Sequence, residues 1–362
     1  MLRSSGMPFR LPPAKRRRRG KARSFRAFTL LEVLAAAALL AIILVMTGSI
    51  ISSSSRVFRQ ANAKIESFQS ARASFDVMTS RLTRATLNTY WDYYDASGAP
   101  FRLASNPTTF VPARYGRYSD LHFLTGQASS LISALPTGLT ALSTQAVFFI
   151  APTGLSADAN YNGQAGLLGA CGYFVAFGND DASKPSFPPT PSRYRWRLME
   201  LSAPVEELSV FGSSSGKLWA ATPVQQGRVR AVAENVIALV VWPKLSTQDD
   251  PEGDDIAADY TYDSRTTNPW SGTPLRQPVQ AHQLPPNVQI SMVVIDEESA
   301  KRLENGATRP PKIDAALAGL FDGSVLEYGG DLEELQKRLS NEKIGFRVFS
   351  TTVMLRESKW SP

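Results

Sequence analysis

The stretch AFTLLEVLAAAALLAIILVMTGSII, residues 27–51, decides the fold, because the rest of the chain must be arranged around the helix that it predicts. From Val33 to Ser55 there is no ionisable side chain. A helix of this length crosses the roughly 30 Å hydrocarbon core of a bilayer. One acid, Glu32, interrupts its start. A carboxylate is costly in an apolar environment, so this position indicates a functional role.

A strongly basic leader precedes the apolar stretch. Together, residues 1–27, the string Phe28-Thr29-Leu30-Leu31-Glu32 and the apolar helix resemble the N-terminal signature of type IV pilins and type II secretion pseudopilins. The resemblance implies that a prepilin peptidase cuts between Ala27 and Phe28 and methylates the new amine, and that the helix stays on the mature chain. The family usually has Gly where this chain has Ala27. The alternative is an ordinary signal peptide or signal anchor, but a secretory apolar region spans only about 7–15 residues.

The charge distribution argues against nucleic-acid binding by the mature chain. The net charge is +7, but residues 1–27 hold ten Lys and Arg and no acid, so removing them leaves −3. The basic block therefore lies on the part expected to be cut away. Basic flanks stay cytoplasmic. We therefore expect a single-pass protein of the bacterial inner membrane, with a cytoplasmic leader and a periplasmic or extracellular domain.

Few residues in the chain suggest catalysis. Cys171 is the one cysteine, so no intrachain disulfide forms, and we expect it to be a small buried residue entering a strand. His122 and His282 lie far apart in the sequence, without Cys or acids at ligand spacing, and no G-x-S-x-G motif is present. We therefore expect neither a zinc site nor a Ser-His-Asp triad, and no enzymatic activity.

After the apolar stretch, residues 52–88 predict an amphipathic continuation of the same helix. Apolar residues recur in steps of three and four at Ala61, Ile65, Phe68, Ala71, Phe75, Met78, Leu82 and Ala85. A helix from Phe28 to about Leu87 would have about 60 residues and a length of roughly 90 Å. A bend is expected at residues 52–55. The second half is expected to pack on the globular domain, the alternative being the coiled-coil neck of a homodimer.

Residues 89–362 predict a mostly antiparallel, β-rich globular domain, which gives an α+β protein. Residues 90–94, YWDYY, are interpreted as a descent into a loop, and 194–201 as a strand with one face in water. The expected strands are 121–124, 146–150, 172–177, 194–201, 236–242, 288–295 and 346–355. Two short helices are expected at 297–304 and 331–339.

Two loops are candidates for ligand sites. Gly163, Gly166, Gly169 and Gly172 lack the spacing of a phosphate loop and predict a hairpin connection. Residues 247–283 predict a flexible acidic loop. Its acids could collect Ca²⁺ through carboxylate oxygens, but their order does not match an EF-hand, so a solvated loop is favoured. The four acids concerned are Asp249, Asp250, Asp254 and Asp255.

The second half of the chain extends the resemblance. Residues 232–242, Asn268-Pro269-Trp270 and Leu284-Pro285-Pro286-Asn287-Val288 are similar to the globular half of J-type minor pseudopilins and PilW-like minor pilins. The closing residues 349–356 are similar to the ends of such chains. Size and layout are also similar to those of the C protein of Verru_Chthon pilin-like cassettes. Insertions at 101–145 and 300–345 depart from the pattern.

Two functions follow as expectations. The first is a non-catalytic minor pilin or pseudopilin, built through its N-terminal helix into a type IV pilus-like or type II secretion filament. Its partners would be the prepilin peptidase and other pilin-like subunits, with Glu32 pairing with the methylated amine of a neighbour. The alternative is a membrane-anchored enzyme or carbohydrate-binding module outside the cytoplasm. Its sugar platform would be Trp91, Tyr93, Tyr94 and Trp270.

Overall fold

The computed structural model describes residues 29–161, 163–182, 184–185, 187–207, 209–211, 218–265, 270–273 and 275–360. The leader, with Ala27 and Phe28, therefore lies outside the described residues. The chain forms two compact units, the first ending at Phe58 and the second beginning at Arg59. Helix α1, Leu30–Leu82, contributes to both units and continues through residues 52–55. It ends five residues before the predicted end.

The first unit contains the apolar part of α1. Residues Leu30–Phe58 are long and apolar enough to cross a membrane, judged by length and composition. At 1.5 Å per residue, the 29 residues extend about 44 Å, more than the roughly 30 Å of a bilayer core. Leu and Ala, which favour helix, dominate the segment, and it contains no proline.

The larger sheet of the second unit is antiparallel, with strand order β7-β6-β5-β4-β3-β9. Its strands are β3 Leu124–Gln127, β4 Leu139–Pro152, β5 Leu168–Gly178, β6 Arg195–Pro204, β7 Val229–Glu234 and β9 Tyr262–Asp263. The strands expected at 146–150, 172–177 and 194–201 are confirmed. The strand expected at 121–124 lies three residues later. Cys171 is buried in β5, as predicted. Gly163 and Gly166 lie in the connection between β4 and β5, as expected, whereas Gly169 and Gly172 lie within β5 itself.

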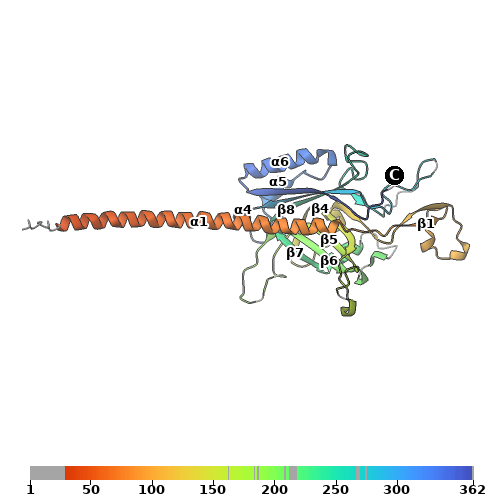
Figure 1. Ribbon diagram of the computed structural model, residues 1–362, viewed down its shortest axis with the longest axis horizontal. Helices are drawn as coiled ribbons and strands as arrows, with labels where there is room; N and C mark the ends of the chain where they lie inside the picture. The colour runs from red at the N-terminus through yellow and green to blue at the C-terminus, as the bar shows by residue number, and fades with distance from the viewer. Residues whose placement is uncertain are drawn as a thin grey trace, which may run out of the picture. The chain divides into compact units, whose positions relative to one another are not determined.

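A smaller antiparallel sheet has the order β11-β10-β8. Its strands are β8 Val236–Lys244, β10 Asn287–Ile295 and β11 Phe346–Met354, all predicted. Helices α5, Pro311–Leu317, and α6, Tyr328–Asn341, lie along one face of this sheet (Figure 1). The ring of Tyr328 packs 5.5 Å from that of Trp242 on β8. Helix α4, Glu297–Leu303, follows β10 and matches its prediction.

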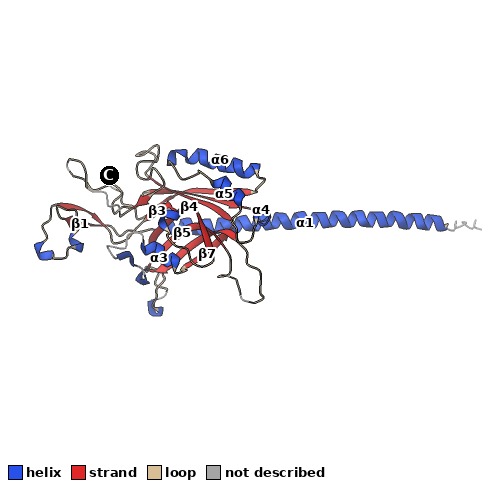
Figure 2. Cartoon of the chain, turned by 180° about the vertical axis from the view of Figure 1, so that it is seen from behind, coloured by secondary structure: helices blue, strands red, loops and turns tan. Residues whose placement is uncertain are grey.

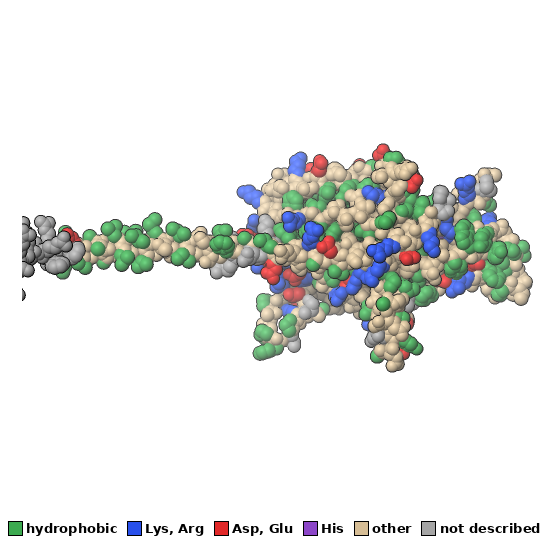
Figure 3. Space-filling view, viewed as in Figure 1, with side chains coloured by type: hydrophobic (Ala, Val, Ile, Leu, Met, Phe, Trp, Pro, Cys, Tyr) green, Lys and Arg blue, Asp and Glu red, His purple; other side chains and the backbone are tan. Residues whose placement is uncertain are grey.

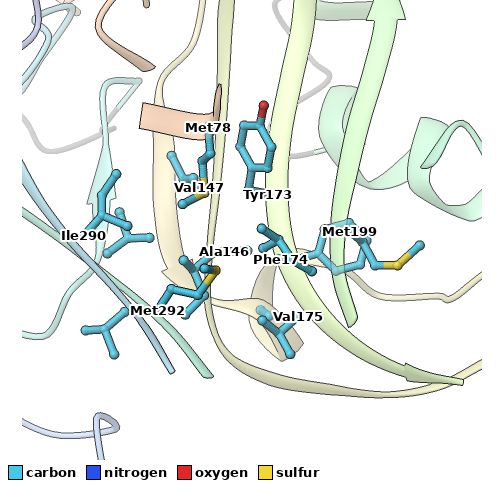
Figure 4. Close-up of a cluster of buried hydrophobic side chains, with 14 of the residues drawn as sticks. Met78, Ala146, Val147, Tyr173, Phe174, Val175, Met199, Ile290 and Met292 are labelled. Carbon is cyan, nitrogen blue, oxygen red and sulfur yellow. The ribbon is translucent and has the colours of Figure 1, made fainter. Parts of the chain in front are cut away.

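The C-terminal part of α1 packs into the core of the second unit. Phe68, Ala71, Phe75, Met78 and Leu82 are buried, and the rings of Phe75 and Phe349 lie 6.0 Å apart. Figure 4 shows Met78 beside Val147 of β4 and Tyr173 of β5, in a cluster that also contains Ile290 and Met292 of β10, so the helix contributes to the core shared by both sheets. The predicted stripe is therefore buried within the chain from Phe68 onward, not in a coiled-coil neck. Its first two members, Ala61 and Ile65, are exposed.

A two-stranded ribbon replaces the loop expected after α1. Strand β1, Tyr90–Tyr94, pairs antiparallel with β2, Arg114–Tyr118, and Tyr93 lies opposite Tyr115. The interpretation of residues 90–94 as a descent into a loop is therefore wrong. The hydrogen-bonding partners of β1 come from a strand about twenty residues later, which local sequence does not reveal. Figure 2 shows the ribbon and the two short helical turns, Phe101–Leu103 and Pro107–Thr109, in the segment that joins its strands.

Strand β6 differs from its prediction, because it has no face in water. Arg195, Arg197 and Glu200 are all buried. A guanidinium nitrogen of Arg195 lies 2.7 Å from Glu304, and Arg197 donates to the carbonyl oxygen of Gly178 at 2.8 Å. Ion pairs and backbone acceptors from other elements therefore replace water around the polar side of the strand.

The other α-helices in the described part of the chain are short. They are α2, Ala128–Leu131, and α3, Leu218–Gln225.

The segment predicted as a flexible acidic loop is partly packed. Tyr260 and Tyr262 within it are buried, and Tyr262 lies in β9.

Candidate functional site

The first candidate site is the start of α1, where Glu32 folds back onto Thr29. The backbone N–H of Thr29 donates to Glu32 Oε2 at 2.9 Å, and its hydroxyl donates to the same oxygen at 3.1 Å. In return, Glu32 N–H donates to Thr29 Oγ1 at 3.3 Å. This reciprocal pair is a capping box, which satisfies N–H groups that a helix start leaves unpaired. The T-x-x-E spacing of Thr29 and Glu32 is the sequence signal of this box, and the box gives Glu32 a role within the chain beside the intersubunit role expected of it.

The apolar part of α1 offers a second surface. No residue in its most apolar window is buried within the described chain. A helix that is apolar all round requires an apolar environment, either a membrane or other helices. The segment could therefore serve as a membrane anchor, and an N-terminal signal sequence has the same length and composition. Within the first unit, Glu32 is the carboxylate at the start of this apolar surface.

Three of the four acids considered for calcium lie together. Carboxylate oxygens of Asp250, Asp254 and Asp255 lie within 4.8 Å of one another. Asp250 accepts the backbone N–H of Gly253 at 2.7 Å and that of Asp255 at 3.1 Å, so both its oxygens already have donors. Asp249 is engaged elsewhere and accepts from the hydroxyl of Ser246 at 2.6 Å. The cluster is thus organised by its own backbone amides.

The four aromatic residues considered as a sugar platform divide into two pairs. Trp91 and Tyr93 are 56% and 54% exposed. Tyr94 is only 4% exposed and donates its hydroxyl to the carbonyl oxygen of Arg117 at 2.6 Å. Trp270 packs edge-on against Tyr94, with ring centroids 5.4 Å apart. These four residues therefore do not form one platform, because successive side chains of β1 point to opposite faces.

The exposed pair has a third member that the sequence did not reveal. Tyr115 on β2 is 56% exposed, and its ring lies 5.2 Å from the rings of both Trp91 and Tyr93. The three rings form an aromatic face on the β1–β2 ribbon. Figure 3 shows hydrophobic side chains gathered over this ribbon. The face could be found only after the pairing of β1 with β2 was known.

Both histidines are hydrogen-bonded within the fold. His122 is buried, with Nε2 2.7 Å from Asp263 Oδ1 and Nδ1 2.8 Å from Trp219 Nε1. Because the indole nitrogen can only donate, Nδ1 accepts and Nε2 carries the proton towards Asp263. Nδ1 of His282 accepts the backbone N–H of Ser119 at 3.2 Å, and burial lowers the pKa of His282 to about 4. Both nitrogens of His122 are thus occupied, which leaves none for a metal or a serine nucleophile.

Comparisons with known proteins give no relative for this chain. No protein-family model, no curated protein and no solved structure matches it. The similarity of residues 28–32 to the prepilin signature therefore stands on the sequence itself.

Proposed function

We propose that this chain is a non-catalytic minor pilin or pseudopilin subunit. The observation that carries the proposal is helix α1, which begins with an apolar, fully exposed segment and ends packed in a β-rich domain. One continuous helix thus joins a surface that needs apolar partners to a folded domain. The prepilin-like string at residues 28–32 stands at the start of that segment.

In this proposal the chain is inserted in the bacterial inner membrane as a single-pass protein. A prepilin peptidase cuts between Ala27 and Phe28 and methylates the amine of Phe28. In the filament, Glu32 exchanges its capping partner Thr29 for the methylated amine of a neighbouring subunit. Pairing in an apolar surrounding is strongly favoured, because an isolated charge there is costly. The amine–carboxylate pair sets the register, and packing of Leu, Ile, Val and Ala holds the helices together.

The decisive test is the mature N-terminus. Mass spectrometry of the protein from its native host is expected to find a chain that begins with methylated Phe28. As a control, the same peptide is searched in a strain that lacks the prepilin peptidase, where residues 1–27 are expected to remain. A terminus after Ile51, or an intact leader in the functional protein, would contradict the proposal.

The aromatic face favours a second candidate, a carbohydrate-binding module anchored by α1. Trp91, Tyr93 and Tyr115 present rings to solvent on one side of the ribbon. Tyr and Trp are suited to surfaces that contact ligands, since each combines apolar area with a polar tip. A pull-down with insoluble polysaccharides tests it. Loss of retention in Trp91→Ala, with retention unchanged in Phe211→Ala at another exposed ring, would support this function.

A further inference from the structure

The second unit contains an arginine-lined cavity that the proposed function does not use. It is open to solvent, has a volume of about 330 Å³, and lies where α1 ends beside β4–β7. Its lining includes Arg81 from the last turn of α1, Arg84 from the turn that follows α1, and Arg230 from β7. Figure 3 shows Lys and Arg side chains gathered over the C-terminal end of α1 and the strands next to it.

A buried carboxylate holds two of these arginines in place. Glu200 on β6 is 1% exposed and forms ion pairs with Arg81 and Arg230. The hydroxyl of Tyr173 also donates to Glu200, at 2.7 Å. The carboxylate is thus fully partnered and rigidly positioned. It orients the two guanidinium groups at the cavity wall before any ligand arrives, which lowers the entropic cost of binding.

The cavity retains unused donors and positive charge. A guanidinium group has five N–H donors. Glu200 engages Nη1 of Arg81, and Nε and Nη2 of Arg230. The exposed guanidinium group of Arg84 has no hydrogen bond or ion pair with a side chain or backbone group of the described residues; its backbone N–H donates to the carbonyl oxygen of Arg81 at 3.0 Å. Three guanidinium groups against one carboxylate leave two positive charges facing the cavity.

The rest of the lining indicates the kind of anion that fits. Thr153 and Ser202 add hydroxyl groups, whereas Ala151, Pro152 and Leu155 form an apolar wall. The ligand is therefore expected to have an anionic head and a small carbon body. A carboxylate has two coplanar oxygens, which suit one guanidinium fork. A phosphomonoester has three terminal oxygens and a charge of about −1.5 to −2 at pH 7, which matches donors from three directions.

We propose that the cavity formed by Arg81, Arg84 and Arg230 binds a phosphomonoester group. Arg84 closes over the phosphate, while Arg81 and Arg230 contact it with the donors that Glu200 leaves free. The carbon body of the ligand lies against Pro152 and Leu155. The phosphate could be carried by a small metabolite or by a lipid headgroup. The site requires neither leader removal nor filament assembly, so its test is independent of the proposed function.

The test is isothermal titration of the full chain in nonionic detergent at low ionic strength. Glycerol 3-phosphate and inorganic phosphate are expected to bind at one site, the former more tightly because of the apolar wall. Phosphatidic acid in mixed micelles tests the lipid source, since competition with glycerol 3-phosphate would place a headgroup in the same cavity. Succinate, a dicarboxylate of similar charge, is expected to bind at least tenfold more weakly.

Arg84→Gln is the informative variant, because an unpaired, exposed side chain can be changed without disturbing the fold. It is expected to weaken binding of glycerol 3-phosphate at least tenfold, about 1.4 kcal/mol. Arg72→Gln removes the same charge from an exposed position on α1 outside the cavity; it breaks only an exposed ion pair with Asp76 and is expected to leave the affinity for glycerol 3-phosphate unchanged. Absence of phosphate binding, equal binding of succinate, or equal affinity of Arg84→Gln and the unsubstituted chain would overturn the proposal.

Discussion

The most direct test of the fold is to remove the side chain of Met78, where α1 contributes to the core. Met78 is 0% exposed and lies beside side chains of β4 and β5, in a cluster that also contains side chains of β10 (Figure 4). Truncating a buried Met to Ala costs about 2–5 kcal/mol, through lost burial and the cavity left behind. The site is walled by β-sheets, which cannot collapse easily, so we expect about 3 kcal/mol or more. Ile65 belongs to the same predicted stripe but is 53% exposed. Its truncation is expected to change stability by about 0.5 kcal/mol or less.

The assay is urea denaturation followed by circular dichroism and by tryptophan fluorescence. With a slope of about 3 kcal/mol per molar, the Met78→Ala midpoint should fall by about 1 M, and the Ile65→Ala midpoint by less than about 0.2 M. Phe75→Ala serves as a second buried variant on the same helix face. Equal effects of Met78→Ala and Ile65→Ala would refute the reasoning, because the stripe would then be buried or exposed along its whole length.

Three further predictions concern the start of the chain, its division into units and its response to acid. The Glu32→Ala and Glu32→Gln variants should both insert into the membrane and be processed, but neither should co-purify with the filament. If Glu32→Gln assembles normally, the role of Glu32 is to cap the helix with Thr29 and not to supply a charge. The chain from Arg56 onward, without the apolar segment, should be soluble and show both helix and strand by circular dichroism. Aggregation under all conditions would count against a domain boundary near Arg56. The free energy of unfolding should fall by up to about 3 kcal/mol as pH decreases from about 6.5 to about 4. In this range His282 takes up a proton in the unfolded chain, whereas in the folded chain the pKa of His282 is about 4 and the imidazole stays neutral. A profile of His282→Gln with the same slope between pH 6.5 and 5 would show that another group is responsible.

Local periodicity was enough to predict the helix and most strands. The steps of three and four from Phe68 to Leu82 describe a face that is buried in the structure. Runs of β-branched and aromatic residues located β5, β8, β10 and β11, because such residues favour strands wherever their partners lie. The sequence analysis expected Glu32 to act only between subunits, and its capping bonds with Thr29 came from the structure.

What covers each element was decided only by the tertiary structure. Alternation along β6 predicted a wet face, yet Glu200 is covered by Arg81 from α1 and Arg230 from β7. On β1, Tyr94 is buried and Tyr93 exposed, because the ribbon packs on one of its two faces. The phosphate-site arginines come from positions almost 150 residues apart in sequence. Periodicity is a property of neighbours along the chain, whereas burial and charge pairing depend on partners from distant segments, and these partners exist only once the chain has folded.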